Sequence, residues 1–519
     1  MNTVLPRIPL GASDAPTLAP QPETPSLLAP TPDIGQQTHT LFNEANVLIK
    51  REVETWQDSA GNYHSASMTH IVTGDQADNI KITAHDSRTL TAIINGKTYP
   101  FPMPESTDLH MINIETQGGN DSVVIGPGVK APVRIITGDG NDRVKTGAGY
   151  ARVNGGSGND SIHLGSGGGI ALGGDGDDRM RAGTGSAVLS GGKGNDVLHA
   201  GKGANHRLVY LNGDQGNDQL YAGAGINVLN GGRGDDKLVG ARKTTLYAGA
   251  GHDVIHSTSK KDRIYAKASD KIHHNRPSNV TFMEVKDVGS KGLKIEGKPE
   301  FIDAVQDVLD QLRGSPVGQR MLEQMDDFVD DIRSPVTLRE SADLNASYYY
   351  FRNAYSDALS AWQSSQFQSE SELGYIKNEV PGAVATHAEI ELQTFHFGQQ
   401  LSTTPMLALQ HELAHAFNGA TGTYQPGNQQ AFGLDGNPIE RYGQPVFVNN
   451  VEYQALGLAI EDGELFDHDN NPLTRPTTLN PSPFTENALR QEMGVPLRDR
   501  YLWDLSLIHI SEPTRRRGI

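Results

Sequence analysis

The chain has 519 residues, 58 glycines and no cysteine, and its formal net charge at pH 7 is −18. The length allows two or three domains, and the absence of cysteine excludes disulfides, thiolate metal sites and a cysteine nucleophile. The negative charge argues against nucleic acid and anionic membrane surfaces as partners, and no apolar run approaches the ~18 residues of a membrane span. The composition favours a protein that binds cations.

Residues 1–40 are rich in proline, threonine, serine and alanine and carry few charges. Such a segment buries too little apolar surface to order itself, so we expect it to be disordered. It lacks the basic start and apolar core of a cleavable signal peptide. Two interpretations stay open: a linker or tail, or an uncleaved export signal like those of injected bacterial effectors.

Residues 41–115 alternate apolar and polar side chains in the manner of β-strands, for example in Ile80–Thr83 and His110–Ile114. The dipeptide Asn95-Gly96 is typical of a hairpin turn. We expect this region to form the β-rich cap of the repeat region that follows it.

Residues 116–274 hold a glycine-rich repeat. Copies such as Gly155-Gly-Ser-Gly-Asn-Asp160-Ser-Ile recur at a step of 18 residues, and the nonapeptides between them lack the aspartate. Glycines permit tight turns with positive φ, their carbonyl groups can face an ion, and the aspartate supplies a carboxylate ligand for Ca²⁺. The aspartates at this position are the candidate calcium ligands: Asp121, Asp142, Asp160, Asp178, Asp196, Asp218, Asp236 and Asp253.

This pattern resembles the RTX calcium β-roll, whose repeat is G-G-x-G-x-D-x-U-x with an apolar residue at U. The resemblance implies an all-β parallel roll, or solenoid, in which calcium ions form a single row along the aspartate side. It also implies a roll that is unfolded where calcium is scarce and folded outside the cell. The alternative is an ion-free solenoid, which is disfavoured because a stack of aspartates without cations would repel itself.

After a linker at residues 275–298, residues 299–504 are built differently. Phe301–Leu312 has the periodicity of an amphipathic helix, and Gly314, Ser315 and Pro316 end it and start a second helix, Val317–Ile332. We expect a further helix within Asp343–Trp362 and a strand at Ile390–Phe397.

The segment His411-Glu412-Leu-Ala-His415 carries the clearest chemistry. On a helix, residues four apart lie on one face, so the two imidazoles can bind one Zn²⁺ while Glu412 deprotonates a water. Thr404 is suited to the N-cap and Pro405 to the first turn. The alternative is an ordinary amphipathic helix that carries two histidines by accident.

A catalytic zinc takes three protein ligands and a water. The extended motif H-E-x-x-H-x-x-G-x-x-H fails, because Asn418 and Thr421 replace its glycine and its third histidine. The third ligand must therefore be distant. Glu452, on a helix-like segment, is the first candidate, Asp462 the second and His396 the third.

Residues 299–504 resemble the NleD-like zinc metalloproteases, effectors that Gram-negative pathogens inject into host cells. Four blocks carry the resemblance in this order: Gly314–Leu322, Leu409–Ala416, Asn450–Leu458 and Thr485–Tyr501. The resemblance implies a compact α+β zincin domain that cleaves host proteins, with signalling kinases among the candidate substrates. The usual members are short, so the preceding calcium roll is a departure from the family.

The sequence thus predicts a secreted zinc endopeptidase with structural calcium, in which Glu412 is the general base. Arg490, Arg498 and Tyr501 are candidates for the group that stabilises the developing oxyanion. The alternative function is a non-enzymatic RTX surface or adhesion protein with an inert peptidase-like domain. Protein substrates are the expected partners, without nucleic acid or a membrane span, and the oligomeric state stays open.

Two further expectations concern the ends of the peptidase region. If the roll serves only folding and delivery, residues 299–504 alone should still cleave. Residues 505–519 resemble a translated sequencing adapter, so we exclude them from the interpretation of fold and function.

Overall fold

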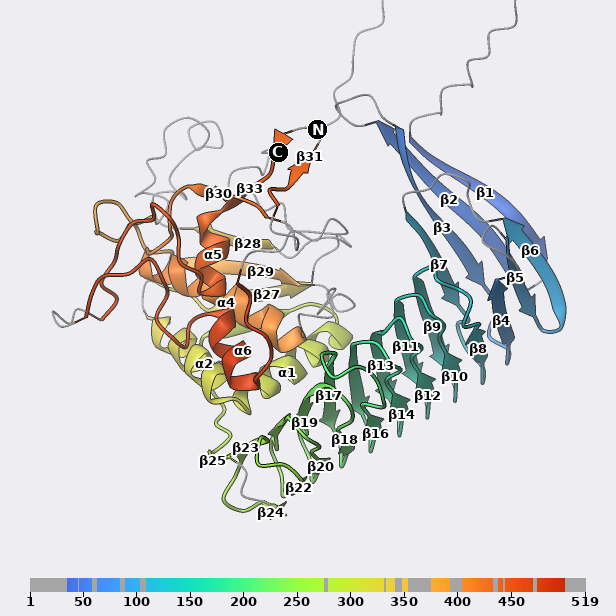
Figure 1. Cartoon of the computed structure of the whole chain (residues 1–519), viewed down its shortest axis with the longest axis horizontal. Coiled ribbons are helices and arrows are strands. Elements are labelled where there is room, and N and C mark those ends of the chain that lie inside the picture. The colour runs from blue at the N-terminus through green and yellow to red at the C-terminus, as the bar shows by residue number, and fades with distance from the viewer. Residues whose placement is uncertain are drawn as a thin grey trace, which may run out of the picture.

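The computed structural model comprises a long two-sheet solenoid and a second region of helices around a small sheet, packed on one side of it (Figure 1). The structure describes residues 35–44, 46–57, 63–84, 89–102, 109–274, 279–330, 333–340, 348–352, 375–392, 404–432, 437–441, 444–469 and 474–499. Most of the segment 1–40, together with His396, Tyr501 and residues 505–519, lies outside these ranges. Among the described residues, no helix is long and apolar enough to cross a bilayer.

The solenoid begins with six strands, whose consecutive members form four antiparallel pairs in two groups of three strands. Ile94 pairs with Lys97 across the turn, where Asn95 and Gly96 have φ of 50° and 81°, so the predicted hairpin turn is confirmed. The six strands are β1 (Gly35–Glu44), β2 (Val47–Gln57), β3 (Tyr63–Val72), β4 (Asn79–Ala84), β5 (Thr89–Ile94) and β6 (Lys97–Pro102).

The rest of the solenoid is parallel, with longer strands in a thirteen-stranded sheet A and shorter strands in a twelve-stranded sheet B. Sheet A continues through β7 (Leu109–Glu115), β9 (Val133–Asp139), β11 (Ala151–Ser157), β13 (Gly169–Asp175), β15 (Ala187–Lys193), β17 (Leu208–Gln215), β19 (Ile226–Asn230), β21 (Thr244–Tyr247), β23 (Arg263–Ala266) and β25 (Asn279–Phe282). Sheet B continues through β8 (Ser122–Ile125), β10 (Arg143–Lys145), β12 (Ser161–His163), β14 (Arg179–Arg181), β16 (Val197–His199), β18 (Gln219–Tyr221), β20 (Lys237–Val239), β22 (Val254–Ser257) and β24 (Lys271–His274).

The repeat sets this geometry. Arg143 pairs with Ser161 and Ser161 with Arg179, so successive coils stack in register at the repeat step of 18 residues. The apolar U residues, for example Ile162, point into a core that is continuous along the solenoid. The turns leave no room for side chains, because a Cβ at Gly156 (φ +107°) would lie 2.1 Å from the carbonyl oxygen of Gly138. The predicted solenoid is confirmed.

The second region contains a four-stranded mixed sheet in the order β26-β27-β29-β28 and five described helices. The sheet strands are β26 (Leu293–Glu296), β27 (Val336–Glu340), β28 (Tyr348–Arg352) and β29 (His387–Leu392), and the short strands are β30 (Asn428–Gln430), β31 (Glu440–Arg441), β32 (Gln444–Pro445) and β33 (Phe447–Asn449). The helices are α1 (Pro299–Arg313), α2 (Pro316–Phe328), α4 (Pro405–Thr421), α5 (Asn450–Leu456) and α6 (Glu486–Met493).

The sequence predictions for this region hold in part. Both N-terminal helices and the strand before α4 are present, although α2 ends at Phe328, earlier than expected, and residues 393–403 lie outside the described ranges. Within Asp343–Trp362, where a helix was expected, Tyr348–Arg352 forms strand β28 instead, and the rest of that segment lies outside the described residues. Pairing of β28 with the edge of β29 determines this conformation, and the local periodicity did not indicate it.

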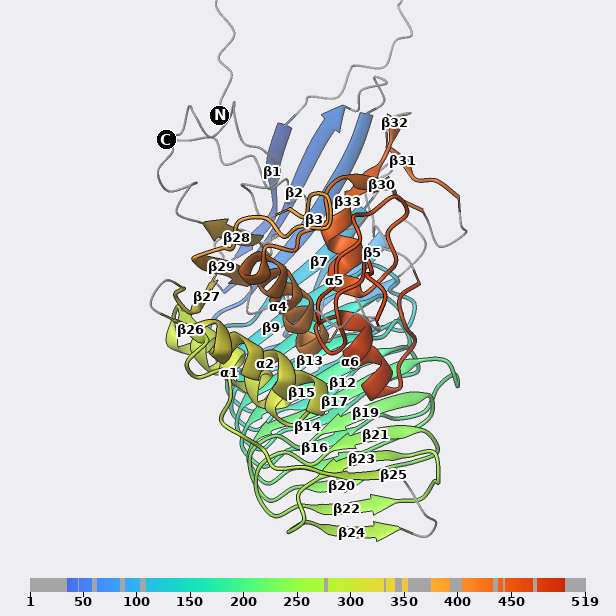
Figure 2. The ribbon, with the colours of Figure 1, turned by 90° about the vertical axis from the view of Figure 1, so that its left-hand side faces the viewer.

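The second region packs against the outer face of sheet A, and two views at right angles agree on this placement (Figure 2). Outward side chains of the roll share one apolar core with α1, including Val188, Tyr210, Val228, Phe301 and Leu309. The sequence alone did not indicate whether the solenoid and the second region are in contact. They share a core, so each buries apolar surface that the other would otherwise leave exposed to water.

Polar contacts fix the relative position of the two regions. The hydroxyl of Tyr210 donates to Gln311 Oε1 at 2.8 Å, and the hydroxyl of Tyr247 donates to Glu492 Oε1 at 2.9 Å. Thr245 Oγ1 donates to the carbonyl oxygen of Met493 at 2.6 Å. Helix α6 is therefore held by the roll near its C-terminal end.

Candidate functional site

The HELAH segment lies on α4 as the sequence predicts. Thr404 caps the helix by accepting from the backbone N–H of Leu407 at 3.2 Å, Pro405 occupies the first turn, and Gly422 ends the helix with φ 69°. The helix is buried on most of its circumference. Its position therefore comes from packing on all sides, which holds its two histidines in place.

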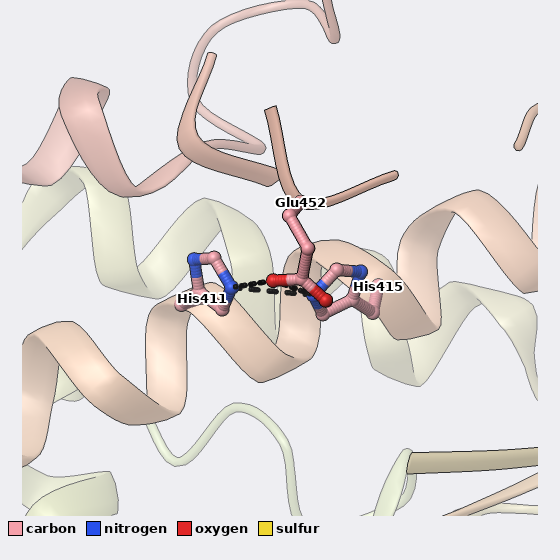
Figure 3. A group of neighbouring side chains, drawn as sticks. All are labelled: His411, His415 and Glu452. Carbon is pink, nitrogen blue, oxygen red and sulfur yellow. Dashed lines mark hydrogen bonds and ion pairs between the residues drawn. The ribbon is translucent and has the colours of Figure 1, made fainter. Parts of the chain in front are cut away.

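Three side chains converge where α4 meets α5: His411, His415 and Glu452 (Figure 3). The Nε2 atoms of the two histidines are 3.2 Å apart, and Glu452 Oε2 lies 3.2 Å from His411 Nε2 and 3.6 Å from His415 Nε2. Among the described residues, this is the one group of three or more potential ligands that meets the distance test for a metal ion. The first-ranked third ligand is thus the one that the fold brings to the histidines.

The geometry fits a four-coordinate metal ion. Ligand atoms at about 2.1 Å from a tetrahedral zinc lie about 3.4 Å from one another, and the three separations here are 3.2, 3.2 and 3.6 Å. Two imidazole nitrogens and a carboxylate oxygen are also the donor types that zinc prefers. Burial would raise the pKa of Glu452, but His415 and His411 hold it well below its usual range, so the carboxylate is ionised as a ligand must be.

Glu412 follows His411 on α4 and is only 5 % exposed. The other candidate ligands do not join the cluster. Asp462 lies in an exposed turn beyond α5, and His396 is outside the described residues.

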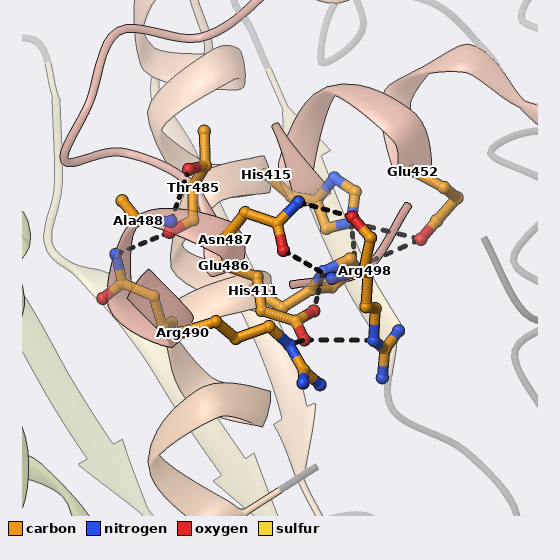
Figure 4. A network of polar contacts seen from close by, with 10 residues as sticks. His411, His415, Glu452, Thr485, Glu486, Asn487, Ala488, Arg490 and Arg498 are labelled. Carbon is orange, nitrogen blue, oxygen red and sulfur yellow. Dashed lines mark hydrogen bonds and ion pairs between the residues drawn. The ribbon is translucent and has the colours of Figure 1, made fainter. Parts of the chain in front are cut away.

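Glu486, at the start of α6, contacts His411 from the side opposite the cluster (Figure 4). Its Oε2 atom lies 3.1 Å from His411 Nδ1, and the side chain is 1 % exposed. A carboxylate in this position fixes the tautomer and the ring orientation of a metal-binding histidine, leaving Nε2 free for the metal. The sequence reasoning did not single out Glu486.

Arg490 and Arg498 bind Glu486. The Nε atom of Arg490 donates to Glu486 Oε1 at 2.6 Å, and the Nε atom of Arg498 lies 3.2 Å from the same oxygen. Burial alone would raise the pKa of Glu486, but the charges of Arg498, His411 and Arg490 hold it well below its usual range. The structure thus places both arginines behind His411. The predicted oxyanion role stays untested for them, and Tyr501 lies outside the described residues.

A second candidate site is the row of aspartates inside the roll. The backbone N–H of each aspartate donates to Oδ1 of the aspartate one coil further on, for example Asp160 to Asp178 and Asp178 to Asp196, both at 2.7 Å. All members are at most 2 % exposed: Asp121, Asp142, Asp160, Asp178, Asp196, Asp218, Asp236 and Asp253.

The other carboxylate oxygen of this row fits a cation. Within the described chain, the Oδ2 atoms of seven members, Asp121 to Asp236, are buried without a hydrogen-bond partner. Beside Asp178 Oδ2 lies the carbonyl oxygen of Gly191 in the next coil, since a Cβ placed on Gly173 would meet both atoms within 2.5 Å. Buried carboxylate and carbonyl oxygens together are calcium donors.

Burial raises the pKa of these carboxyl groups. The pKa reaches about 7 for Asp160, Asp178 and Asp196, about 9 for Asp218 and about 8 for Asp236. Ionised aspartates in this row therefore need a cation.

Asp253 differs from the rest of the row. Its Oδ2 atom lies 3.2 Å from Lys267 Nζ, which also donates to the carbonyl oxygen of Gly249 at 2.7 Å. An ammonium group thus stands where a cation would bind in the other coils. The predicted calcium role of Asp253 has a competitor that the sequence reasoning did not consider.

Comparison with known families found two matches. Residues 289–501 match the Peptidase_M91 family, described as an effector protein. This region is thus similar to the M91 effector family, and we call it the M91 domain. Four segments, residues 136–170, 172–206, 212–242 and 245–269, match the RTX calcium-binding nonapeptide repeat. No curated protein and no solved structure matches the chain.

The M91 match supports a peptidase that acts on proteins, and the RTX match implies calcium binding by the roll. Both families are typically secreted. The three-ligand cluster and Glu486 all lie within the M91 domain, whereas Asp121 precedes the first matched RTX segment. One sequence signal could have pointed to Glu486: an N-cap at Thr485 followed by an acidic residue with an arginine four positions later.

Proposed function

We propose that this protein is a secreted zinc endopeptidase of effector type that hydrolyses peptide bonds in host proteins. The observation that carries the proposal is the convergence of His411, His415 and Glu452, with separations that match the edges of a zinc tetrahedron. The M91 match supports the proteolytic reaction. The finer resemblance to NleD-like proteases makes host signalling kinases candidate substrates.

In the proposed mechanism, His411, His415 and Glu452 would hold the zinc. When bound, the metal would supply an acidified water and a Lewis acid for the scissile carbonyl group. Glu412 accepts the proton of the attacking water and later gives it to the leaving amine, so that the C–N bond breaks as the new C–O bond is kept. Glu486 accepts the Nδ1–H of His411, and Arg490 and Arg498 keep Glu486 ionised and in place.

The RTX repeats serve as a calcium-dependent folding module in this proposal. Calcium binding between coils offsets the charge of the buried aspartates, so the roll folds where calcium is abundant. Because the M91 domain shares an apolar core with the roll, we propose that folding of the roll also completes the folding of the peptidase.

The test is a screen for new protein N-termini in a host-cell lysate treated with the full chain in calcium. Wild type and the matched control Glu461→Gln, which changes an exposed carboxylate of the same domain, should produce the same set of new N-termini. Glu412→Gln should produce none while it keeps its zinc and its circular dichroism spectrum. Cleavage retained in Glu412→Gln would contradict the proposed role of Glu412 as the general base. A wild type that holds calcium but no zinc, and does not cleave, would favour the non-enzymatic alternative.

A further inference from the structure

The outer face of sheet B lies on the side of the roll away from the M91 domain (Figure 1). Its outward side chains carry a concentration of positive charge. We define the basic face as the sixteen outward positions of strands β10 to β24. Six of them are Lys or Arg, four are His and none is acidic. The cationic and histidine positions are Arg143, Lys145, His163, Arg179, Arg181, His199, Lys237, His256, Lys271 and His273.

Salt bridges of the described residues do not neutralise these charges, although hydrogen bonds from Asn195, and then the charge of Arg179, lower the pKa of the adjoining Asp177. Within the described residues, no salt bridge joins a lysine or arginine of the basic face to a carboxylate; Lys237 instead lies over the ring of Tyr221. Burial, followed by the charges of Arg181 and Lys145, lowers the pKa of His163. Although the whole chain has a net charge of −18, positive and negative charges lie on different parts of the roll. The outer face of sheet B is basic, whereas the exposed aspartates lie along the neighbouring turn edge.

In-register stacking arranges the face as two columns that follow the roll axis. One column runs Lys145, His163, Arg181 and onward, with one side chain from each coil. Parallel strands lie about 4.8 Å apart, so the eight strands span roughly 34 Å. The result is a rigid stripe, two side chains wide, whose lysines and arginines lie on β10, β14, β20 and β24.

The shape and borders of the stripe select the partner. A flat anionic membrane would also approach the adjoining edge, where the exposed Asp175, Asp177 and Asp235 would repel it. The rings of His199 and Tyr221 stack on each other at 4.5 Å and 15°, and Lys237 lies over the Tyr221 ring, so these aromatic side chains offer little open ring surface to the bases of single-stranded nucleic acid. A narrow linear polyanion can follow the stripe without approaching the edge aspartates, and it does not need aromatic rings for base stacking.

We propose that the basic face binds a linear acidic polysaccharide, with sulfate or carboxylate groups on successive sugars, which lies along the roll axis. Arg179 and Arg181 stand side by side on β14, one in each column, and form the centre of the site. Such binding would concentrate the full-length protein on a glycan-coated surface. This inference is independent of the peptidase chemistry.

The test measures fluorescence anisotropy of a labelled heparin dodecasaccharide with the full chain, in calcium and at physiological salt. Wild type should bind, and the double variant Arg179→Ser with Arg181→Ser should bind about tenfold more weakly or worse, with a shallower salt dependence. The matched control, Lys260→Ser with Lys261→Ser, removes two exposed lysines from a turn of the same roll and should stay within twofold of wild type. Circular dichroism verifies that both variants keep the roll.

Three results would overturn the proposal. The first is no binding of the oligosaccharide by wild type. The second is an equal loss in both double variants, which would indicate a diffuse charge effect. The third is tighter binding to phosphatidylserine vesicles or to a single-stranded oligonucleotide than to the oligosaccharide, which would assign the face to another class of partner.

Discussion

Replacing one buried aspartate of the roll should change stability in opposite directions with and without calcium. Asp178 is fully buried, its Oδ1 atom accepts from the N–H of Asp160 at 2.7 Å, and burial raises its pKa from 3.8 to about 7. In Asp178→Asn, the amide oxygen can keep the bond to Asp160, and the amide group can donate to the nearby carbonyl oxygen of Gly191. The variant therefore removes the charge while it preserves the shape.

The raised pKa gives the size of the effect. Each pKa unit corresponds to about 1.4 kcal/mol, so ionised Asp178 destabilises the calcium-free fold by about 4 kcal/mol at pH 8. A raised folded-state pKa adds stability that is fully present below the unfolded pKa and is lost as pH rises through about 7. Without calcium, Asp178→Asn should be more stable than wild type at pH 8, and this advantage should shrink on acidification. With calcium, the variant lacks a carboxylate ligand and should be less stable.

The assay is urea unfolding of the full chain, followed by β-sheet circular dichroism in EGTA at pH 8 and pH 5 and in millimolar calcium at pH 8. Asp177→Asn changes the exposed neighbouring carboxylate and should stay within about 0.5 kcal/mol of wild type in EGTA. If Asp178→Asn loses its β-structure in EGTA at pH 8 as readily as wild type, the assignment of an uncompensated buried charge is wrong.

The remaining predictions concern the metal site and the contact between the two regions. Glu486→Gln removes the anionic acceptor of His411 and should raise the zinc dissociation constant about 10- to 100-fold, measured by competition with a chelating indicator; an unchanged constant would exclude the orienting role. Tyr247→Phe deletes the hydrogen bond to Glu492 and should lower the stability of the helical signal by about 1–3 kcal/mol in thermal unfolding, whereas Tyr221→Phe, on the outer face of sheet B, should not. Residues 299–504 expressed alone should unfold at a lower temperature than the same region in the full chain, and an equal temperature would show that the shared core adds no stability.

Features with a short sequence period were predictable. The step of 18 residues and the U positions such as Ile162 specify the solenoid, because each coil repeats the same local turn and strand. The α4 helix follows equally from Thr404 and Pro405 at its start and from apolar spacing along it. Local chemistry determines these elements, so sequence sufficed.

Features that depend on contacts between segments far apart in the sequence were harder to predict. Sequence ranked Glu452 first among three possible ligands, but only the packing of α5 on α4 brings it to the histidines. Tyr210 and Tyr247 point outward from sheet A, where an isolated roll would expose them, and docking of the M91 domain buries both. The outer face of sheet A is apolar here, whereas the outer face of sheet B is basic. This difference is present in the sequence and could have indicated on which face of the roll the M91 domain packs.

The most direct test of the proposed zinc centre is the metal content of three purified full-length proteins, measured by inductively coupled plasma mass spectrometry after dialysis against a weak chelator. Wild type and Asp462→Ala should each hold one zinc per chain, and Glu452→Ala should hold none while its circular dichroism spectrum stays that of wild type. Zinc retained by Glu452→Ala, or a wild type without zinc, would contradict the assignment of His411, His415 and Glu452 as the metal ligands.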